Sequence, residues 1–117
     1  MLRKVVASLP LVLLIAVAAG LAQAQTPEPV DAEAARHLAS RNDCFKCHAI
    51  DKAKKAPPFK RIAARLKSKP DAVETIREHI SAGNMVQLED GADERHRIID
   101  TRNPEELRNL ALWILSL

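Results

Sequence analysis

The sequence contains very few aromatic residues and no tyrosine. Its 117 residues include two phenylalanines and one tryptophan, so aromatic side chains make up 3% of the chain. Large rings usually supply much of the apolar volume in the core of a small domain. Because they are scarce here, we expect a bound cofactor to fill part of the core and to stabilise the folded state by binding it preferentially.

Long hydrophobic runs are also scarce, and the one that is present lies near the start of the chain. Residues 9–22 carry no charge, and Arg3 and Lys4 precede them. This run is shorter than the roughly 20 residues needed to cross a bilayer, and the small residues Ala22 and Ala24, in Ala22-Gln23-Ala24, suit a signal peptidase that cleaves after Ala24. We therefore predict that residues 1–24 are a signal peptide, that cleavage leaves no membrane segment, and that the protein is exported to the periplasm. An uncleaved anchor is the alternative.

Acidic residues are nearly missing from one segment. Residues 46–69 contain nine basic side chains against Asp51 alone, whereas residues 25–45 and 70–117 are both net acidic. A basic segment of this kind can steer an acidic protein partner into contact, and a solvated lysine-rich face is the alternative. Nucleic-acid binding is not expected, because the segment lacks the interleaved aromatic residues that stack on bases and the chain is predicted to be exported.

Period-two alternation, which is typical of half-buried strands, is absent, and four segments show helical spacing instead. The first begins after Asp31 as N-cap and runs to about Asn42, and the second follows the prolines at positions 57 and 58. The third begins near Pro70 and ends at Gly83, and the fourth has Asn103 as N-cap with Pro104 in its first turn. We predict an all-α domain of about four helices over residues 31–117, preceded by a tail at residues 25–30.

The only two cysteines lie in the segment Cys44-Phe45-Lys46-Cys47-His48. This C-x-x-C-H pattern is typical of covalent haem attachment. Each thiol can add to one vinyl group of the haem, and the adjacent histidine is then held beside the iron as its proximal ligand. The motif predicts one covalent haem c, bound through Cys44 and Cys47, with His48 on the iron.

A close pair of cysteines has three other common uses. A structural disulfide would close a very small loop and would constrain the chain little. A thioredoxin-like pair is expected within a βαβ unit, which the pattern does not predict, and a zinc site would need a second cluster with ligand spacing. Haem attachment is favoured because the motif agrees with the predicted export of the chain.

From residue 31 onward the sequence resembles the class I c-type cytochromes. The resemblance rests on three stretches of sequence: NDCFKCHAID at 42–51, KKAPPF at 54–59 and LALWILSL at 110–117. It implies the cytochrome c fold, in which helices surround one covalently attached haem. It also implies that the first and last helices cross through small and large apolar residues, here Ala35, Leu38 and Ala39 against Leu110 and Trp113. In that family a proline carbonyl accepts a hydrogen bond from the proximal histidine, and Pro57 matches that proline best.

The second axial ligand is where this sequence departs from the family pattern. Most relatives use a methionine from a proline-rich loop shortly before the last helix, but Met85 lies 28 positions before Trp113 and that loop is missing. His96 lies 17 positions before Trp113, where the resemblance places the ligand. We predict that His96 is the distal ligand, with Met85 as the alternative; a solvated histidine in an acidic loop is the other interpretation. Two imidazoles favour ferric iron more than a thioether does, which predicts a lower reduction potential than in methionine-ligated relatives.

The resemblance implies a one-electron carrier that cycles between Fe(III) and Fe(II). The sequence offers no nucleophile, general base or second metal cluster, so we expect no catalysis by the chain itself. It could act with redox protein partners, or as the electron-transferring subunit of a periplasmic oxidoreductase, either as a monomer or within a complex. A haem-based gas sensor is the alternative function, in which His96 dissociates because the loop that carries it moves.

Overall fold

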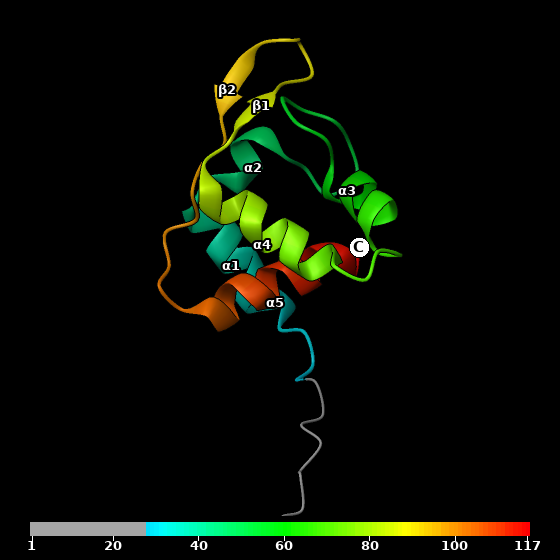
Figure 1. Cartoon of the computed structure of the whole chain (residues 1–117), viewed down its shortest axis with the longest axis vertical. Helices are drawn as coiled ribbons and strands as arrows, with labels where there is room; N and C mark the ends of the chain where they lie inside the picture. The colour runs from blue at the N-terminus through cyan, green and yellow to red at the C-terminus, as the bar shows by residue number, and fades with distance from the viewer. Residues whose placement is uncertain (1–27) are drawn as a thin grey trace, which may run out of the picture.

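The computed structural model describes residues 28–117, so the predicted signal peptide at residues 1–24 lies outside the described residues. Five helices and one two-stranded antiparallel sheet follow one another along this part of the chain (Figure 1). Their bounds are α1 (Ala32–Arg41), α2 (Cys44–Cys47), α3 (Phe59–Leu66), α4 (Ala72–Ala82), β1 (Met85–Gln87), β2 (Asp93–Arg95) and α5 (Pro104–Leu115). The predicted all-α fold class is confirmed, since the four expected helices are α1, α3, α4 and α5.

The caps of α1 and α5 are those that the sequence predicts. The Asp31 carboxylate accepts a hydrogen bond from the Ala34 backbone N–H at 2.9 Å, and the Asn103 side-chain oxygen accepts one from the Glu105 N–H at 3.0 Å. Each bond satisfies a backbone donor that a helix otherwise leaves without a partner in its first turn. Pro104 is the first residue of α5, where its missing N–H does no harm.

Helix α4 begins two residues later than the sequence suggested and ends where it predicted. Asp71 is its N-cap, so Pro70 lies outside the helix, not in its first turn. Gly83 ends α4 with φ of 62°, a left-handed conformation that favours glycine. A Cβ atom at this position would lie 3.0 Å from the Ile98 side chain. Gly83 therefore both turns the chain and lets the segment after β2 pack against the end of α4.

The antiparallel hairpin of β1 and β2 was not predicted. Met85 pairs with Arg95 and Gln87 pairs with Asp93, and each strand is three residues long. Five of the six strand residues are exposed and Val86 is half-buried, so the hydrophobic alternation that announces a half-buried strand is missing. The hairpin projects from the helices at the end of the domain opposite the start of the described chain (Figure 1).

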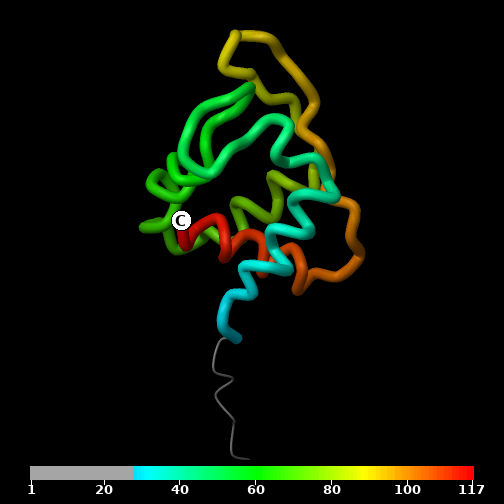
Figure 2. Tube along the Cα trace, turned by 180° about the vertical axis from the view of Figure 1, so that it is seen from behind, coloured from blue at the N-terminus to red at the C-terminus, as the bar shows by residue number. Residues whose placement is uncertain are grey.

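Helices α1 and α5 cross closely, and α5 also packs against α3 and α4 (Figure 2). The crossing is lined by side chains that are 4% exposed or less: Ala35, Leu38, Ala39, Leu110, Ala111, Trp113 and Ile114. Small side chains let the two backbones approach, while Trp113 reaches further and meets Phe59 edge-to-face with 5.6 Å between ring centres. No helix within residues 28–117 combines the length and apolarity needed to cross a membrane.

Candidate functional site

Both cysteines lie on the single-turn helix α2, directly after α1. Asn42 caps α1, and Asp43 adopts a left-handed conformation with φ of 60° that turns the chain into α2. The His48 backbone N–H then donates to the Cys44 carbonyl at 2.9 Å, which closes the turn. Burial raises the pKa of the Cys44 thiol to about 11. A thiol with this pKa stays protonated at neutral pH, and only the thiolate is a good nucleophile. This argues against a thioredoxin-like function.

The His48 ring is fixed on two sides. Its Nδ1 donates a hydrogen bond to the Pro57 carbonyl at 2.6 Å, and the ring stacks on Phe59 with 4.9 Å between centres and 18° between planes. Because a carbonyl only accepts, Nδ1 carries the proton and Nε2 is left as the free ring nitrogen. Burial lowers the pKa of His48, so the ring is neutral at pH 7, the form in which imidazole binds a metal.

The chain between His48 and α3 folds back so that Pro57 meets the histidine. The Ala56 N–H donates to the Cys47 carbonyl at 3.0 Å, and the Phe59 N–H donates to the Ala49 carbonyl at 2.9 Å. These bonds fix both flanks of the proline pair. The hydrogen bond that the resemblance implied for Pro57 therefore depends on a well-paired loop.

His96 lies directly after β2, far from His48 along the chain. Its backbone N–H donates to the Asn84 carbonyl at 2.8 Å, and its ring Nδ1 donates to the Arg97 carbonyl at 2.8 Å. Its Nε2 is therefore free, as in His48. The centres of the two rings are 6.4 Å apart, with 53° between the planes.

Two cavities meet at these two histidines. The first, of about 590 Å³, is lined by both cysteines, by His48 and His96, and by apolar side chains that include Leu88 and Ile99. The second, of about 550 Å³, is lined by the same two histidines and by residues of α3, α4 and α5. Each volume lies within the range of cofactor sites, about 300–1,000 Å³. The cysteines, the free ring nitrogens and the apolar walls together fit a covalently attached haem.

Met85 lies away from this arrangement. It is 57% exposed on β1 and is not among the residues that line either cavity. His79, in contrast, lies beside the site, exposed in the last turn of α4. Its ring centre is 4.3 Å from that of His96, and it lines the second cavity. Burial and the neighbouring histidines lower its pKa. No local pattern announces this contact, because it depends on how α4 packs against the segment after β2.

The hairpin is tied to the loop that follows the cysteines. The Glu89 backbone N–H donates to the Lys55 carbonyl at 2.9 Å, and the Glu89 carboxylate pairs with Arg61 at 3.0 Å. Lys55, Val86 and Leu88 all line the first cavity. The hairpin therefore forms a strap across one edge of this cavity.

Comparison with known proteins gives a consistent result. Residues 32–117 match the family model described as Cytochrome c. The class 1 cytochrome MtoD from Sideroxydans lithotrophicus ES-1 is 40% identical in sequence and superposes with a TM-score of 0.72, covering 75% of this chain and 97% of that one. Wild-type cytochrome c552 from Nitrosomonas europaea is 26% identical with a TM-score of 0.56, covering 69% and 96%. A comparison with curated proteins found no match.

The family match spans the described helices and both halves of the site. Members of this family bind one covalent haem c and carry electrons without being enzymes, and the cysteine pair with its adjacent histidine is present here. The chain belongs to the cytochrome c family: it is a class I c-type cytochrome, an electron carrier with one covalent haem c.

Proposed function

We propose that this cytochrome is a periplasmic one-electron carrier whose iron is held by two histidines. In this proposal Cys44 and Cys47 form the thioethers, His48 is the proximal ligand and His96 is the distal ligand. Residues 1–24 are the cleaved signal peptide and residues 31–117 form the haem domain. The intact mass of the protein from a periplasmic fraction tests the cleavage site and the covalent haem together.

The spacing of the two histidine rings is the observation that carries bis-histidine ligation. An imidazole nitrogen binds a divalent metal at about 2 Å, so the ring centres of two axial imidazoles on one metal lie about 6 Å apart. The centres of His48 and His96 are 6.4 Å apart, and Nε2 is free on both rings. Met85, by comparison, is exposed on the hairpin.

Spectroscopy of the oxidised holoprotein tests this ligation. We expect a low-spin ferric spectrum without the near-infrared band of methionine ligation. The variant H96A should become high-spin and bind carbon monoxide readily when reduced, while M85L, the matched control, should keep the wild-type spectrum. A methionine band that disappears in M85L but persists in H96A would refute His96 as the ligand. Rapid, stoichiometric binding of carbon monoxide by the wild type at neutral pH would favour the gas sensor.

We further propose that the basic segment 46–69 docks acidic redox partners, such as an oxidoreductase that this chain serves as partner or subunit. All nine of its basic residues are exposed. Four of them line the two cavities: Lys46 and Lys55 the first, Arg65 and Lys69 the second. Acidic residues also line both cavities, but basic residues outnumber them in each, so the openings through which a haem edge would exchange electrons carry net positive charge.

Small redox reagents of opposite charge test the docking surface without a known partner. The variant K55E should slow oxidation by the ferricyanide anion severalfold at about 10 mM ionic strength and should speed oxidation by a cationic cobalt complex. Both effects should vanish at about 1 M salt, where the Debye length is about 3 Å. R102E changes charge by the same amount outside the segment and should have little effect. Equal effects of the two variants would show that only total charge matters.

A further inference from the structure

The segment that carries His96 has no regular secondary structure, yet several hydrogen bonds hold it. It runs from the end of β2 to Asn103, the N-cap of α5. The Ile99 N–H donates to the Ile80 carbonyl of α4 at 2.9 Å, and the Asp100 N–H donates to the side-chain oxygen of Asn42 at 2.7 Å. Asn42 holds the segment through its side chain, and it lies two residues before Cys44.

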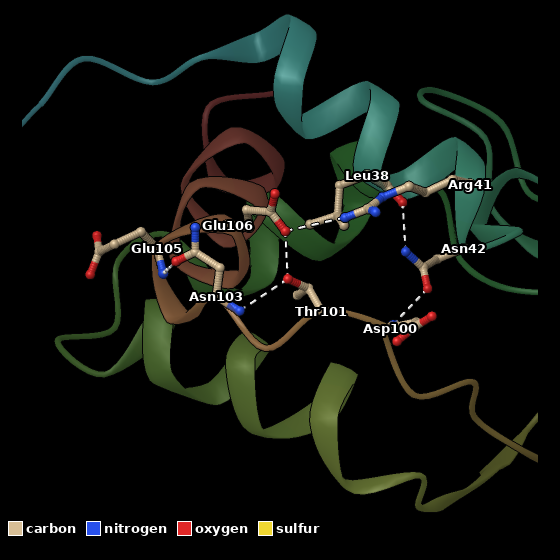
Figure 3. Close-up of polar contacts among 8 residues, drawn as sticks. All are labelled: Leu38, Arg41, Asn42, Asp100, Thr101, Asn103, Glu105 and Glu106. Atoms are coloured by element: carbon tan, nitrogen blue, oxygen red, sulfur yellow. Dashed lines mark hydrogen bonds and ion pairs between the residues drawn. The ribbon is translucent and has the colours of Figure 1, made fainter.

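Asn42 uses both ends of its side-chain amide (Figure 3). Its Nδ2 donates to the Leu38 carbonyl at 2.9 Å while its Oδ1 accepts from the Asp100 N–H. Asn42 is 4% exposed and is the one buried polar or charged residue within residues 28–117. A buried polar group of this kind is costly unless it is paired. An amide supplies a donor and an acceptor at this length, whereas alanine supplies neither.

A second contact beside Asn42 joins the same two parts of the chain. Arg97, the residue after His96, forms an ion pair with Asp43 at 3.0 Å. Asp43 is the left-handed residue that turns the chain into α2. The segment that carries His96 is therefore attached to the two residues that precede Cys44.

We infer that Asn42 is a positioning residue for the distal ligand: it sets the place of His96 relative to a haem that is anchored at Cys44. This inference rests on the proposed bis-histidine ligation. The Asn42–Asp100 bond resists movement of the His96 segment away from α1. Loss of the bond leaves the Asp100 N–H without this partner in a part-buried setting. His96 should then leave the iron more often, while the covalent attachment of the haem is unaffected.

The rate at which an external ligand enters tests this inference in the holoprotein. Carbon monoxide binds ferrous haem only after the distal ligand has left, so its limiting binding rate reports the release of His96. We expect this rate to rise at least tenfold in N42A and in the milder N42S, which serves if N42A does not accumulate. N42D keeps an acceptor for Asp100 but loses the donor to the Leu38 carbonyl, so its rate should lie between those of the wild type and N42A.

N103A is the matched control, because it also removes a side-chain oxygen that accepts from a backbone N–H. It should lower thermal stability and leave the carbon monoxide rate within twofold of the wild type. An unchanged rate in N42A and N42S, or an equal rise in N103A, would overturn the role of Asn42 even if H96A loses its low-spin spectrum. If H96A keeps the wild-type spectrum, the ligation proposal fails, and the positioning of a ligand by Asn42 fails with it.

Discussion

His48 and His96 each donate from Nδ1 to a main-chain carbonyl, that of Pro57 and that of Arg97. Neither acceptor is a side chain. Substitution of Arg97 by another residue therefore keeps the backbone carbonyl that accepts from His96. The orientation of both rings therefore depends on loop conformation more than on the identity of the residues that supply the acceptors. This makes the side chains that support the loops, such as Phe59 on the proximal side, more informative targets than the acceptors themselves.

Phe59 links the proximal histidine to the helical core. It is 3% exposed, stacks on His48 and contacts both Phe45 and Trp113 edge-to-face. We predict that F59A lowers the unfolding free energy of the holoprotein by about 3–5 kcal/mol, the usual cost of deleting a buried aromatic ring. Guanidinium titration monitored by far-UV circular dichroism measures the loss. K60A, at the exposed neighbouring position, should change stability by less than about 0.5 kcal/mol, and a similar loss in both variants would contradict the prediction.

The sequence predicts site residues that belong to a motif or lie at a characteristic spacing. It does not predict residues that reach the site only through packing of distant segments. The spacing of Cys44, Cys47 and His48 is itself the signature of haem attachment. The resemblance to class I cytochromes predicts His96 as the distal ligand from its distance to Trp113. The contacts of His79 and Asn42 depend on where α4 and the segment after β2 lie in space. Asn42 reads in sequence as an ordinary helix end, because its partner Asp100 is 58 positions away.

At the scale of elements, the crossing of α1 and α5 depends on alanines. Ala39 and Ala111 are both 0% exposed, so no space remains at the contact for a larger side chain. Close approach of the helices also brings Asp31 to Asn109, where the side-chain amide of Asn109 donates to the Asp31 carbonyl at 2.8 Å and accepts from its N–H at 2.9 Å.

We predict that A39L destabilises the protein by about 1–3 kcal/mol, because added methylene groups in a closely packed contact force the two helices apart. A34L places the same side chain on the exposed face of the same helix and should change stability by less than about 0.5 kcal/mol. Thermal unfolding of both holoproteins measures the difference. Equal stability of the two variants would mean that the crossing can relax without loss.

Helices with strong caps and a continuous apolar stripe could be predicted from the sequence. The two short strands, which have no hydrophobic alternation, could not. Asn103, Pro104 and the leucines that follow specify α5 from local sequence alone. The strands β1 and β2 have no such pattern, because Val86 is their only half-buried residue. They are held by backbone pairing and by the contacts of Glu89 with Lys55 and Arg61, which are tertiary.

At the scale of the whole molecule, the scarcity of aromatic residues and the two cavities both indicate that the polypeptide alone fills only part of the core. Phe59 and Trp113 are the only buried aromatic residues in the described chain, and cavities of about 590 and 550 Å³ meet at the histidines. An apolar cofactor bound there converts cavity walls into packed core. The polypeptide and the haem are therefore expected to fold as one unit.

We predict that the chain without haem is largely unfolded. A variant with both attachment cysteines replaced, C44S together with C47S, should lose most of the helical circular dichroism signal of the holoprotein at 25 °C and should melt without a cooperative transition. The wild-type holoprotein, measured in the same buffer, is the control. Full helical signal with a cooperative transition in the haem-free variant would show that the polypeptide core suffices.

The two hydrogen bonds between Asp31 and Asn109 fasten the start of the domain to the middle of its last helix. From Asn109 to Leu117 the chain advances only about 12 Å at helical rise. Residues 31 and 117 therefore lie close enough in space for a short linker to join them. New termini at Gly91, which is exposed at the tip of the hairpin, would then give a circular permutant in which each element keeps its neighbours. The cysteine motif would then lie near the middle of that chain, after α5.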